Sequence, residues 1–354
     1  MMELFSGGRQ LVGLDIGSHS LKLAEILKTN EGYILNQFTQ MPLARGVITD
    51  GILTEKEKLT QTIKKLFGSA NLKRKGIVTS LSGHSVIVKK VTMPVTDKET
   101  LRELIHDEAG KYLPFDSMQD VNFDFQILGE NAFNAKQTDI LIVAAKKETV
   151  DSFADAIKNA GLPVEIMDVD SFALETMYEE NYDFEESDVD AIINIGASIT
   201  NINVVKNGTS IFTRDFSLGG DAVTEALQKQ KGITFEEAEK IKIETSTNEG
   251  SNELNRSLIT YAEPICSEIE RSIDYFRSIS GGENIRKILL AGGGAKTPGL
   301  ADTISHRLNI ETEIVNPFKL IEINEKTIDT TYMTEIGPIA AVAVGLALRK
   351  IGDQ

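Results

Sequence analysis

Leu11-Val12-Gly13-Leu14-Asp15-Ile16-Gly17-Ser18-His19-Ser20-Leu21-Lys22 is the stretch that decides the fold of this 354-residue chain. In it, an apolar strand ends in an acidic residue, a glycine turn follows, and a second alternating strand returns. The same plan recurs in Ala191-Ile192-Ile193-Asn194-Ile195-Gly196-Ala197-Ser198-Ile199-Thr200, where Asn194 takes the place of Asp15. Glycine lets backbone N–H groups approach an anion closely, so two such hairpins facing each other predict a polyphosphate site between two lobes.

A third glycine turn, Leu289-Leu290-Ala291-Gly292-Gly293-Gly294-Ala295-Lys296-Thr297-Pro298, completes the set. Its glycines leave room for a flat base, and Lys296 could lay its stem along that base. Thr297 and Pro298 predict a helix start, with Thr as N-cap and Pro at the first helical position. The turn suits the adenosine end of a nucleotide, and a plain strand-to-helix turn is the alternative.

The composition is that of a globular protein, with 41% hydrophobic and 25% charged residues. A formal charge of −16 repels phosphate backbones, which argues against sequence-independent nucleic-acid binding. The lone Cys266 cannot form an internal disulfide. We expect no membrane span, which needs roughly 18 consecutive apolar residues, and the N-terminus lacks a signal-peptide pattern. We therefore expect a cytosolic protein.

Hydrophobic patterning predicts a first lobe with an insertion. The first half of this lobe is predicted to be a β-β-β-α-β unit. It has strands over 11–16, 21–27 and 33–40, a helix opened by a capping box of Thr54 with Glu57, and a strand over 76–80. Residues 85–161 predict a β-α-β-β-α unit, whose first helix opens with a second capping box, Thr96 with Glu99, and whose last helix stops at Gly161. Because a strand over 164–169 resumes the first lobe, we interpret this unit as an insertion.

The second lobe follows a polar, acidic crossing at 181–190. It repeats the opening of the first lobe, with strands over 191–195, 199–205 and 210–216. The chain then continues with helices around 221–230, 235–244 and 252–279, a strand over 287–290 and a closing helix over 335–350. The predicted domains are 1–84 plus 162–187 with the closing helix 335–350, the insertion 85–161, and the second lobe 188–334.

Three side chains carry the predicted phosphate chemistry. Asp15 ends a buried strand, where a carboxylate needs a cation or hydrogen bonds; it is predicted to hold Mg²⁺, through water, or alternatively to cap its own turn. Lys22 could reach a phosphate as a point charge, or be an exposed strand lysine. Asn194 can orient water or a ligand but cannot accept a proton as a base, so we expect slow hydrolysis at most.

The other predicted ligand contacts lie in the same turns and on one helix. Glu239 and Lys242 stand three residues apart on a helix face, where they could grip a ribose or form a surface ion pair. The full cofactor-binding set is Asp15, Gly17, Ser18, His19, Ser20, Lys22, Asn194, Gly196, Ala197, Ser198, Thr200, Gly220, Glu239, Lys242, Gly292, Gly293, Gly294 and Lys296. No catalytic residue is assigned, and Asp170 is the carboxylate retained as a candidate base.

The ordered glycine motifs and a small-residue closing helix, with Gly337, Ala341 and Gly345, resemble the actin, heat-shock-70 and sugar-kinase superfamily. This implies an α/β, actin-like (ribonuclease-H-like) two-lobed nucleotide-binding fold with an inserted β-α-β-β-α subdomain, ATP and Mg²⁺ as cofactors, and ribose or adenine contacts at Glu239, Lys242 and Lys296. Asn194 departs from the superfamily's usual second Asp. Four stretches are similar to the PilM family of type IV pilus assembly, the FtsA-like branch: 108–116, 124–128, 168–175 and 212–215.

The resemblance implies a cytoplasmic ATP-binding scaffold, associated with the inner membrane through its partners in the type IV pilus complex. It implies that the N-terminal cytoplasmic tail of PilN docks in a groove between the first lobe and the insertion, and that nucleotide state sets lobe closure. Leu113, Pro114 and Phe115 either line that groove or belong to a core. An FtsA-like membrane tether is the alternative, but expects an amphipathic C-terminal anchor that residues 351–354 do not provide. A sugar kinase, with Asp168 or Asp170 as base, is a third reading, and homo-oligomerisation is left open.

Overall fold

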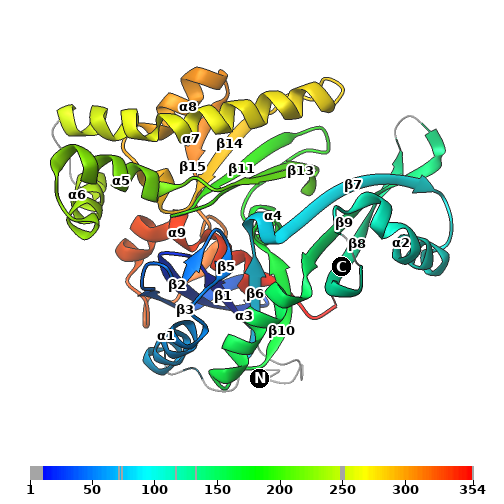
Figure 1. Cartoon of the computed structure of the whole chain (residues 1–354), viewed down its shortest axis with the longest axis horizontal. Coiled ribbons are helices and arrows are strands. Elements are labelled where there is room, and N and C mark those ends of the chain that lie inside the picture. The colour runs from blue at the N-terminus through cyan, green and yellow to red at the C-terminus, as the bar shows by residue number, and fades with distance from the viewer. Residues whose placement is uncertain are drawn as a thin grey trace.

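The structure is a computed structural model that describes residues 11–70, 72, 75–115, 118–131, 134–247 and 252–352. It has two lobes stacked one above the other and a smaller unit that projects from one side (Figure 1). Asp116, the last residue of one family-like stretch, lies outside the described residues, as do Asp353 and Gln354. The mixed α/β architecture predicted from the sequence is confirmed.

The first lobe is built on a six-stranded sheet of order β10-β6-β1-β2-β3-β16. Its strands are β1 (Leu11–Ile16), β2 (Ser20–Thr29), β3 (Gly32–Pro42), β6 (Gly76–Leu81), β10 (Val164–Val169) and β16 (Ile321–Ile323), and a two-stranded ribbon of β4 (Ile48–Thr49) and β5 (Ile52–Leu53) lies beside it. Sequence analysis found the first five and missed β16, which is too short for a pattern. Although β16 falls within the predicted second lobe, Ile321 pairs with Tyr33 of the first sheet.

The insertion is a three-stranded sheet of order β7-β9-β8 with one helix on it. Its elements are η1 (Gly83–Ser85), β7 (Val86–Pro94), α2 (Lys98–Tyr112), η2 (Met118–Asp120), β8 (Val121–Asn131), β9 (Asn134–Lys146) and α3 (Lys147–Asn159). Leu113 is buried in the core of this unit together with Leu101 and Ile105, so the core alternative holds for Leu113; Pro114 is exposed and Phe115 packs at the edge of that core.

Helix α3 closes the predicted β-α-β-β-α unit but packs on the first lobe. Its Phe153, Ala156 and Ile157 share a buried cluster with Leu59 and Ile63 of α1 (Lys56–Ser69). The Thr60 hydroxyl donates a hydrogen bond of 3.1 Å to the Ala156 carbonyl. The last element of the insertion therefore anchors the projecting sheet to the body of the molecule (Figure 1).

The second lobe repeats the plan on a five-stranded sheet of order β13-β12-β11-β14-β15. Its elements are β11 (Val189–Ile195), β12 (Thr200–Lys206), β13 (Thr209–Phe216), α5 (Gly220–Lys231), α6 (Phe235–Thr247), α7 (Asn252–Ile279), β14 (Lys287–Ala291), η3 (Gly294–Lys296), α8 (Leu300–Leu308) and β15 (Glu311–Ile314). The long helix α7 and α8 cover its outer face (Figure 1). Strand β15 was also missed by the sequence analysis.

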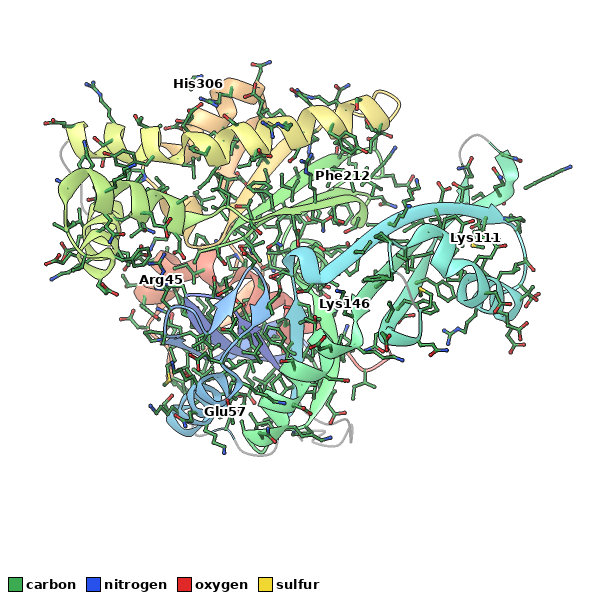
Figure 2. All side chains as sticks on the ribbon, in the orientation of Figure 1. Arg45, Glu57, Lys111, Lys146, Phe212 and His306 are labelled. Atoms are coloured by element: carbon green, nitrogen blue, oxygen red, sulfur yellow. The ribbon has the colours of Figure 1, made fainter. Side chains whose placement is uncertain are left out.

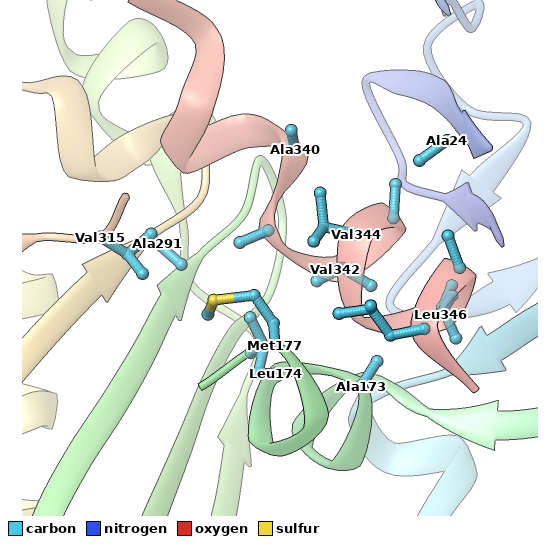
Figure 3. Close-up of a cluster of buried hydrophobic side chains, with 14 of the residues drawn as sticks. Ala24, Ala173, Leu174, Met177, Ala291, Val315, Ala340, Val342, Val344 and Leu346 are labelled. Atoms are coloured by element: carbon cyan, nitrogen blue, oxygen red, sulfur yellow. The ribbon is translucent and has the colours of Figure 1, made fainter. Parts of the chain in front are cut away.

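Helices α4 (Asp170–Glu179) and α9 (Thr330–Leu348) pack against each other between the two sheets. Figure 3 shows apolar side chains of α9 facing those of α4, Ala24 of the first sheet and Ala291 of the second. The approach is so close that a Cβ added to Gly345 would lie 1.7 Å from the Ala173 carbonyl oxygen. The small residues of the closing helix therefore let two helix backbones meet where the lobes join.

Helix α9 also corrects the expectation about membrane spans. Among the described residues, α9 is the one helix that is long and apolar enough to cross a membrane: it has 19 residues, and an 18-residue window within it has a mean hydropathy of 1.4. Within that window 72% of the residues are buried inside the fold, as in the core helix of a globular domain.

The helix starts predicted from capping patterns are wrong in three places. Thr54 spends its hydroxyl on the Gly46 and Val47 carbonyls of the preceding turn, and α1 begins without a side-chain cap. At α2 the cap is Asp97, one residue after Thr96; its carboxylate accepts from the backbone N–H groups of Glu99 and Thr100. Helix α8 begins after Gly299, beyond the predicted Thr297-Pro298 start. Each pattern marked the right region, but neighbouring groups competed for the hydrogen bonds.

Candidate functional site

A cavity of about 410 Å³ opens between the two lobes, a volume within the range of small-molecule sites. Both hairpins, the third glycine turn and helices α5, α6 and α9 contribute to its wall. The predicted residues that line it are Asp15, Gly17, Ser18, His19, Ser20, Lys22, Asp170, Asn194, Gly196, Ala197, Ser198, Gly220, Glu239, Lys242, Gly292, Gly293, Gly294 and Lys296. Thr200 is the exception: it is fully buried and donates its hydroxyl to the Leu218 carbonyl at 2.7 Å.

The two hairpins have matching geometry and face each other. The Gly17 N–H donates to the Ser20 carbonyl at 3.2 Å, and the Gly196 N–H donates to the Ile199 carbonyl at 2.9 Å. Across the cleft, the Ser198 hydroxyl donates to the Ser18 hydroxyl at 2.8 Å. The repeated motif therefore places two equivalent turns on opposite walls of one cavity.

In the first hairpin, Asp15 and Lys22 are register partners on β1 and β2 and form an ion pair. Lys22 Nζ lies 3.1 Å from Asp15 Oδ2, and the two side chains are only 13% and 10% exposed. The alternative of an exposed strand lysine is therefore excluded. A largely buried pair of this kind presents both a cationic and an anionic group to whatever occupies the cavity.

In the second hairpin, the same two register positions hold Asn194 and Asn201. Asn194 donates through Nδ2 to Asn201 Oδ1 at 3.0 Å. Asn201 lines the cavity and is 2% exposed, and within the described part of the chain its Nδ2 has no hydrogen-bond partner. Sequence analysis missed Asn201, although its spacing from Asn194 equals that of Lys22 from Asp15.

Asp170 is a second, partly buried carboxylate of the cavity, beside Asp15. It opens α4 and accepts a hydrogen bond of 2.5 Å from the Ser80 hydroxyl. Burial, together with the negative charge of Asp15, raises the pKa of Asp170 to about 7. Asp168 is committed elsewhere, because Arg349 binds both of its oxygens at 2.6 and 3.0 Å. Of the two carboxylates considered as a base, only Asp170 therefore faces the cavity.

The third glycine turn, Gly292 to Gly294, forms another part of the cavity wall. Gly292 has a φ of +84°, and a Cβ there would lie 2.4 Å from the Ile195 carbonyl oxygen, so the turn requires glycine. Its N–H donates to the Pro338 carbonyl at 2.8 Å, which seats the turn on α9. Exposed Ile243 and Tyr332 add apolar surface to the cavity wall nearby.

Helices α5 and α6 bring a buried polar cluster to the wall. Lys242 Nζ lies 2.7 Å from Glu239 Oε2 and donates to the Thr224 hydroxyl at 2.7 Å and to the Gly220 carbonyl at 3.0 Å. Burial works against ionisation of Glu239, but Lys242 holds the pKa of Glu239 below its usual value. The predicted surface pair is thus an ordered, charged part of the cavity.

A magnesium ion fits this site only together with an anionic ligand. Within the described ranges, no group of three or more His, Cys, Asp or Glu side chains is arranged to hold a metal by itself. Magnesium is commonly bound by one or two carboxylates with substrate phosphates and water. Asp15 lines the cavity, where it could serve as such a carboxylate.

The two sheets, the paired hairpins and the shared cleft define the class of this protein, which has the actin-like ATPase fold. The particular family follows from a family model, "Type IV pilus assembly protein PilM", that matches residues 13–351. The chain belongs to the PilM family.

One solved structure agrees with this family assignment, and two more distant ones share the fold. The protein of a "PilM-PilN type IV pilus biogenesis complex" is 28% identical with a TM-score of 0.84, covering 97% of this chain and 99% of that one. EutJ from Carboxydothermus hydrogenoformans is 16% identical with a TM-score of 0.57, covering 95% and 88%. MreB5 of Spiroplasma citri bound to AMPPNP is 13% identical with a TM-score of 0.52, covering 95% and 94%. The last two likenesses show the fold alone.

Proposed function

We propose that this chain is a cytoplasmic ATP-binding scaffold of the type IV pilus inner-membrane complex, and that Mg·ATP binds in the interlobe cavity. The observation that carries the proposal is the pair of matched hairpins, whose Ser18 and Ser198 hydroxyls lie 2.8 Å apart across the cleft. The buried ammonium of Lys22 would bind a phosphate, and Asp15 would hold the magnesium ion through water. When bound, Mg²⁺ neutralises phosphate charge in a strongly acidic protein.

The base and ribose of the nucleotide would lie toward the third glycine turn. Gly293 leaves open space there, since an added Cβ would meet no atom within 4 Å, and Ile243 and Tyr332 supply apolar surface to the cavity wall. Glu239, fixed by Lys242, is the acceptor we assign to the ribose hydroxyls. A relative of the same fold, MreB5, binds AMPPNP, which supports a nucleotide as the class of ligand.

Nucleotide state would set lobe closure, because contacts cross the cleft on both sides of the cavity. The Gly83 N–H donates to Asp215 Oδ2 at 2.6 Å, and Ile199 rests on the backbone of Gly83. Arg45 of the first lobe pairs with Glu225 of α5 at the boundary between the lobes (Figure 2). A ligand held by both hairpins would favour the closed population without any need for turnover.

The partner we propose is the N-terminal cytoplasmic tail of PilN, with membrane association arising through it. The support is the likeness, over nearly the whole of both chains, to the protein of a PilM-PilN complex. The docking groove is proposed between the first lobe and the insertion, where exposed Pro114 and partly buried Phe115 remain candidates for its lining. Family membership favours this role over both an FtsA-like tether and a sugar kinase.

Calorimetric titration of Mg·ATP tests the site. Asp15→Ala and Lys22→Ala should each weaken binding at least ten-fold, about 1.4 kcal/mol. Lys28→Ala is the matched control, because Lys28 lies on the same strand but is exposed over the Tyr33 ring. Circular dichroism melting curves establish that the variants fold. Equal affinity in wild type and both site variants would remove the phosphate assignment.

Fluorescence anisotropy with a labelled PilN-tail peptide tests the partner, with a scrambled peptide as control. Saturable binding of the native tail that changes on addition of Mg·ATP is the expected result. Phe115→Ser should weaken it if this residue lines the groove. Equal binding of the native and scrambled peptides would refute the docking role and leave the nucleotide site standing.

A further inference from the structure

We propose that Asn201 is a ligand-contacting residue, whose free amide N–H group donates a hydrogen bond to an oxygen of the bound phosphate chain. The inference rests on the proposed nucleotide function and assigns a further binding residue to the same site. Asn201 belongs to none of the glycine turns, and it is the second of the six buried residues that begin β12.

The first support is an unsatisfied donor. Asn201 Oδ1 accepts from Asn194, but its Nδ2 has no partner among the described residues, and the side chain is nearly fully buried. A buried donor left without a partner is costly, because it gives up its hydrogen bonds to water and gains none in the fold. Such groups in native structures are rare and need a physical reason. Because Asn201 lines the interlobe cavity, a ligand in that cavity is the partner that its position provides.

The second support is the internal repeat. In the first lobe Asp15 and Lys22 are paired in register, and in the second lobe Asn194 and Asn201 are paired in register. Asn201 is therefore the structural counterpart of Lys22 on the opposite wall. The first pair is ionic and the second is neutral, but each leaves a nitrogen donor beside the cavity.

The chemistry of the free group narrows what it can bind. An amide nitrogen carries hydrogens and no lone pair for a metal, so Asn201 Nδ2 must meet an acceptor. Oxygens of a phosphate chain are strong acceptors, and hydrogen bonds to a charged acceptor are shorter and stronger than neutral ones. A neutral donor on one wall and the Lys22 cation on the other would hold the phosphates between the lobes.

The substitutions Asn201→Asp and Asn201→Ala separate a ligand contact from a structural role. Aspartate keeps an oxygen that accepts from Asn194 Nδ2, and replaces only the free donor by a negatively charged oxygen. Alanine removes the free donor and also the oxygen that accepts from Asn194 Nδ2. Asn30→Asp is the matched control, because Asn30 is exposed in the β2–β3 turn and adds the same charge far from the cavity.

In calorimetric titrations with Mg·ATP, Asn201→Asp and Asn201→Ala should bind at least ten-fold more weakly than wild type, and Asn30→Asp within two-fold of it. The ligand-free melting temperature of Asn201→Ala should fall, because Asn194 Nδ2 loses its acceptor; Asn201→Asp keeps that acceptor and is the variant that isolates the ligand contact. Wild-type affinity in both Asn201 variants, or a lowered ligand-free melting temperature with unchanged affinity, would overturn the inference. A wild-type protein that binds no Mg·ATP would overturn the proposed function itself.

A crystal structure with Mg·AMPPNP supplies a test that needs no variant to fold. Asn201 Nδ2 should lie within hydrogen-bond distance, about 3.2 Å or less, of a phosphate oxygen. A nucleotide seated between the hairpins with Asn201 Nδ2 bonded to protein alone would refute the contact while preserving the site.

Discussion

Gly345→Ala tests the helix contact on which the junction between the lobes depends. An alanine Cβ at this position of α9 would lie 1.7 Å from the Ala173 carbonyl oxygen and 2.5 Å from the Ala173 carbonyl carbon. Both atoms belong to the backbone of α4, so no side-chain rotation can relieve the overlap. The two helices must separate, and the apolar cluster around them must repack (Figure 3).

The size of the effect follows from that geometry. Overpacking a core by a single methyl group typically costs about 1–3 kcal/mol, and a clash with backbone belongs at the upper end. A loss of about 3 kcal/mol should lower the melting temperature by roughly 4 °C in a chain of 354 residues. The helical preference of alanine opposes this by about 1 kcal/mol at most.

Thermal unfolding followed by circular dichroism measures the change, with Gly68→Ala as the matched control. Gly68 is also helical, near the end of α1, but a Cβ there would meet nothing within 4 Å. The same chemical change should therefore raise stability at Gly68, by about 0.4–1 kcal/mol, and lower it at Gly345. The reasoning fails if Gly345→Ala melts at or above the wild-type temperature.

Three further predictions concern titration, hydrolysis and closure. Burial raises the pKa of Glu175 to about 7, so the stability that its protonated form contributes is present below pH 4.5 and is lost as the pH rises through 7. In urea unfolding, Glu175→Gln should therefore gain up to roughly 3 kcal/mol of stability over wild type between pH 4.5 and 8. A difference in stability between the two proteins that does not change with pH would contradict this. With Asn194 unable to act as a base, phosphate release should stay below about one turnover per second; several per second would refute it. Arg45→Ala removes an exposed ion pair with Glu225 and a contact with the Phe235 ring, whose centroid lies 4.0 Å from the guanidinium, so the closed arrangement of the lobes should be destabilised by about 1 kcal/mol. A radius of gyration from X-ray scattering that is the same for the ligand-free variant and wild type would contradict this.

Local patterns in the sequence predicted most of the fold. The repeated strand–turn–strand plan predicted β1 and β2 in one lobe and β11 and β12 in the other, and the glycine turns are at their predicted positions. Apolar alternation and turn residues are local signals, and they survive in any fold that buries those strands. The missed strands are all short: β4 and β5 have two residues each, and β15 and β16 have four and three, which is too few for an alternating pattern.

The cavity residues show where local reasoning stops. Lys22 was equally consistent with a solvent-exposed strand residue, and only its burial beside Asp15 decides between the two readings. Asp168 and Asp170 stand two residues apart with similar neighbours in sequence, yet one binds Arg349 and the other faces the cavity. Asn201 carries no motif, and its free donor becomes visible only when the opposite wall is in place.

By itself, then, the sequence determined the order of the elements, the repeat that creates two like lobes, and the residues that turn the chain where they meet. Tertiary structure alone decided which side chains share the cavity, which of two neighbouring acids faces it, and how closely α4 and α9 approach. The reason is physical: strand and turn propensities act over a few residues, whereas burial, ion pairing and unsatisfied donors depend on atoms that folding brings from distant parts of the chain.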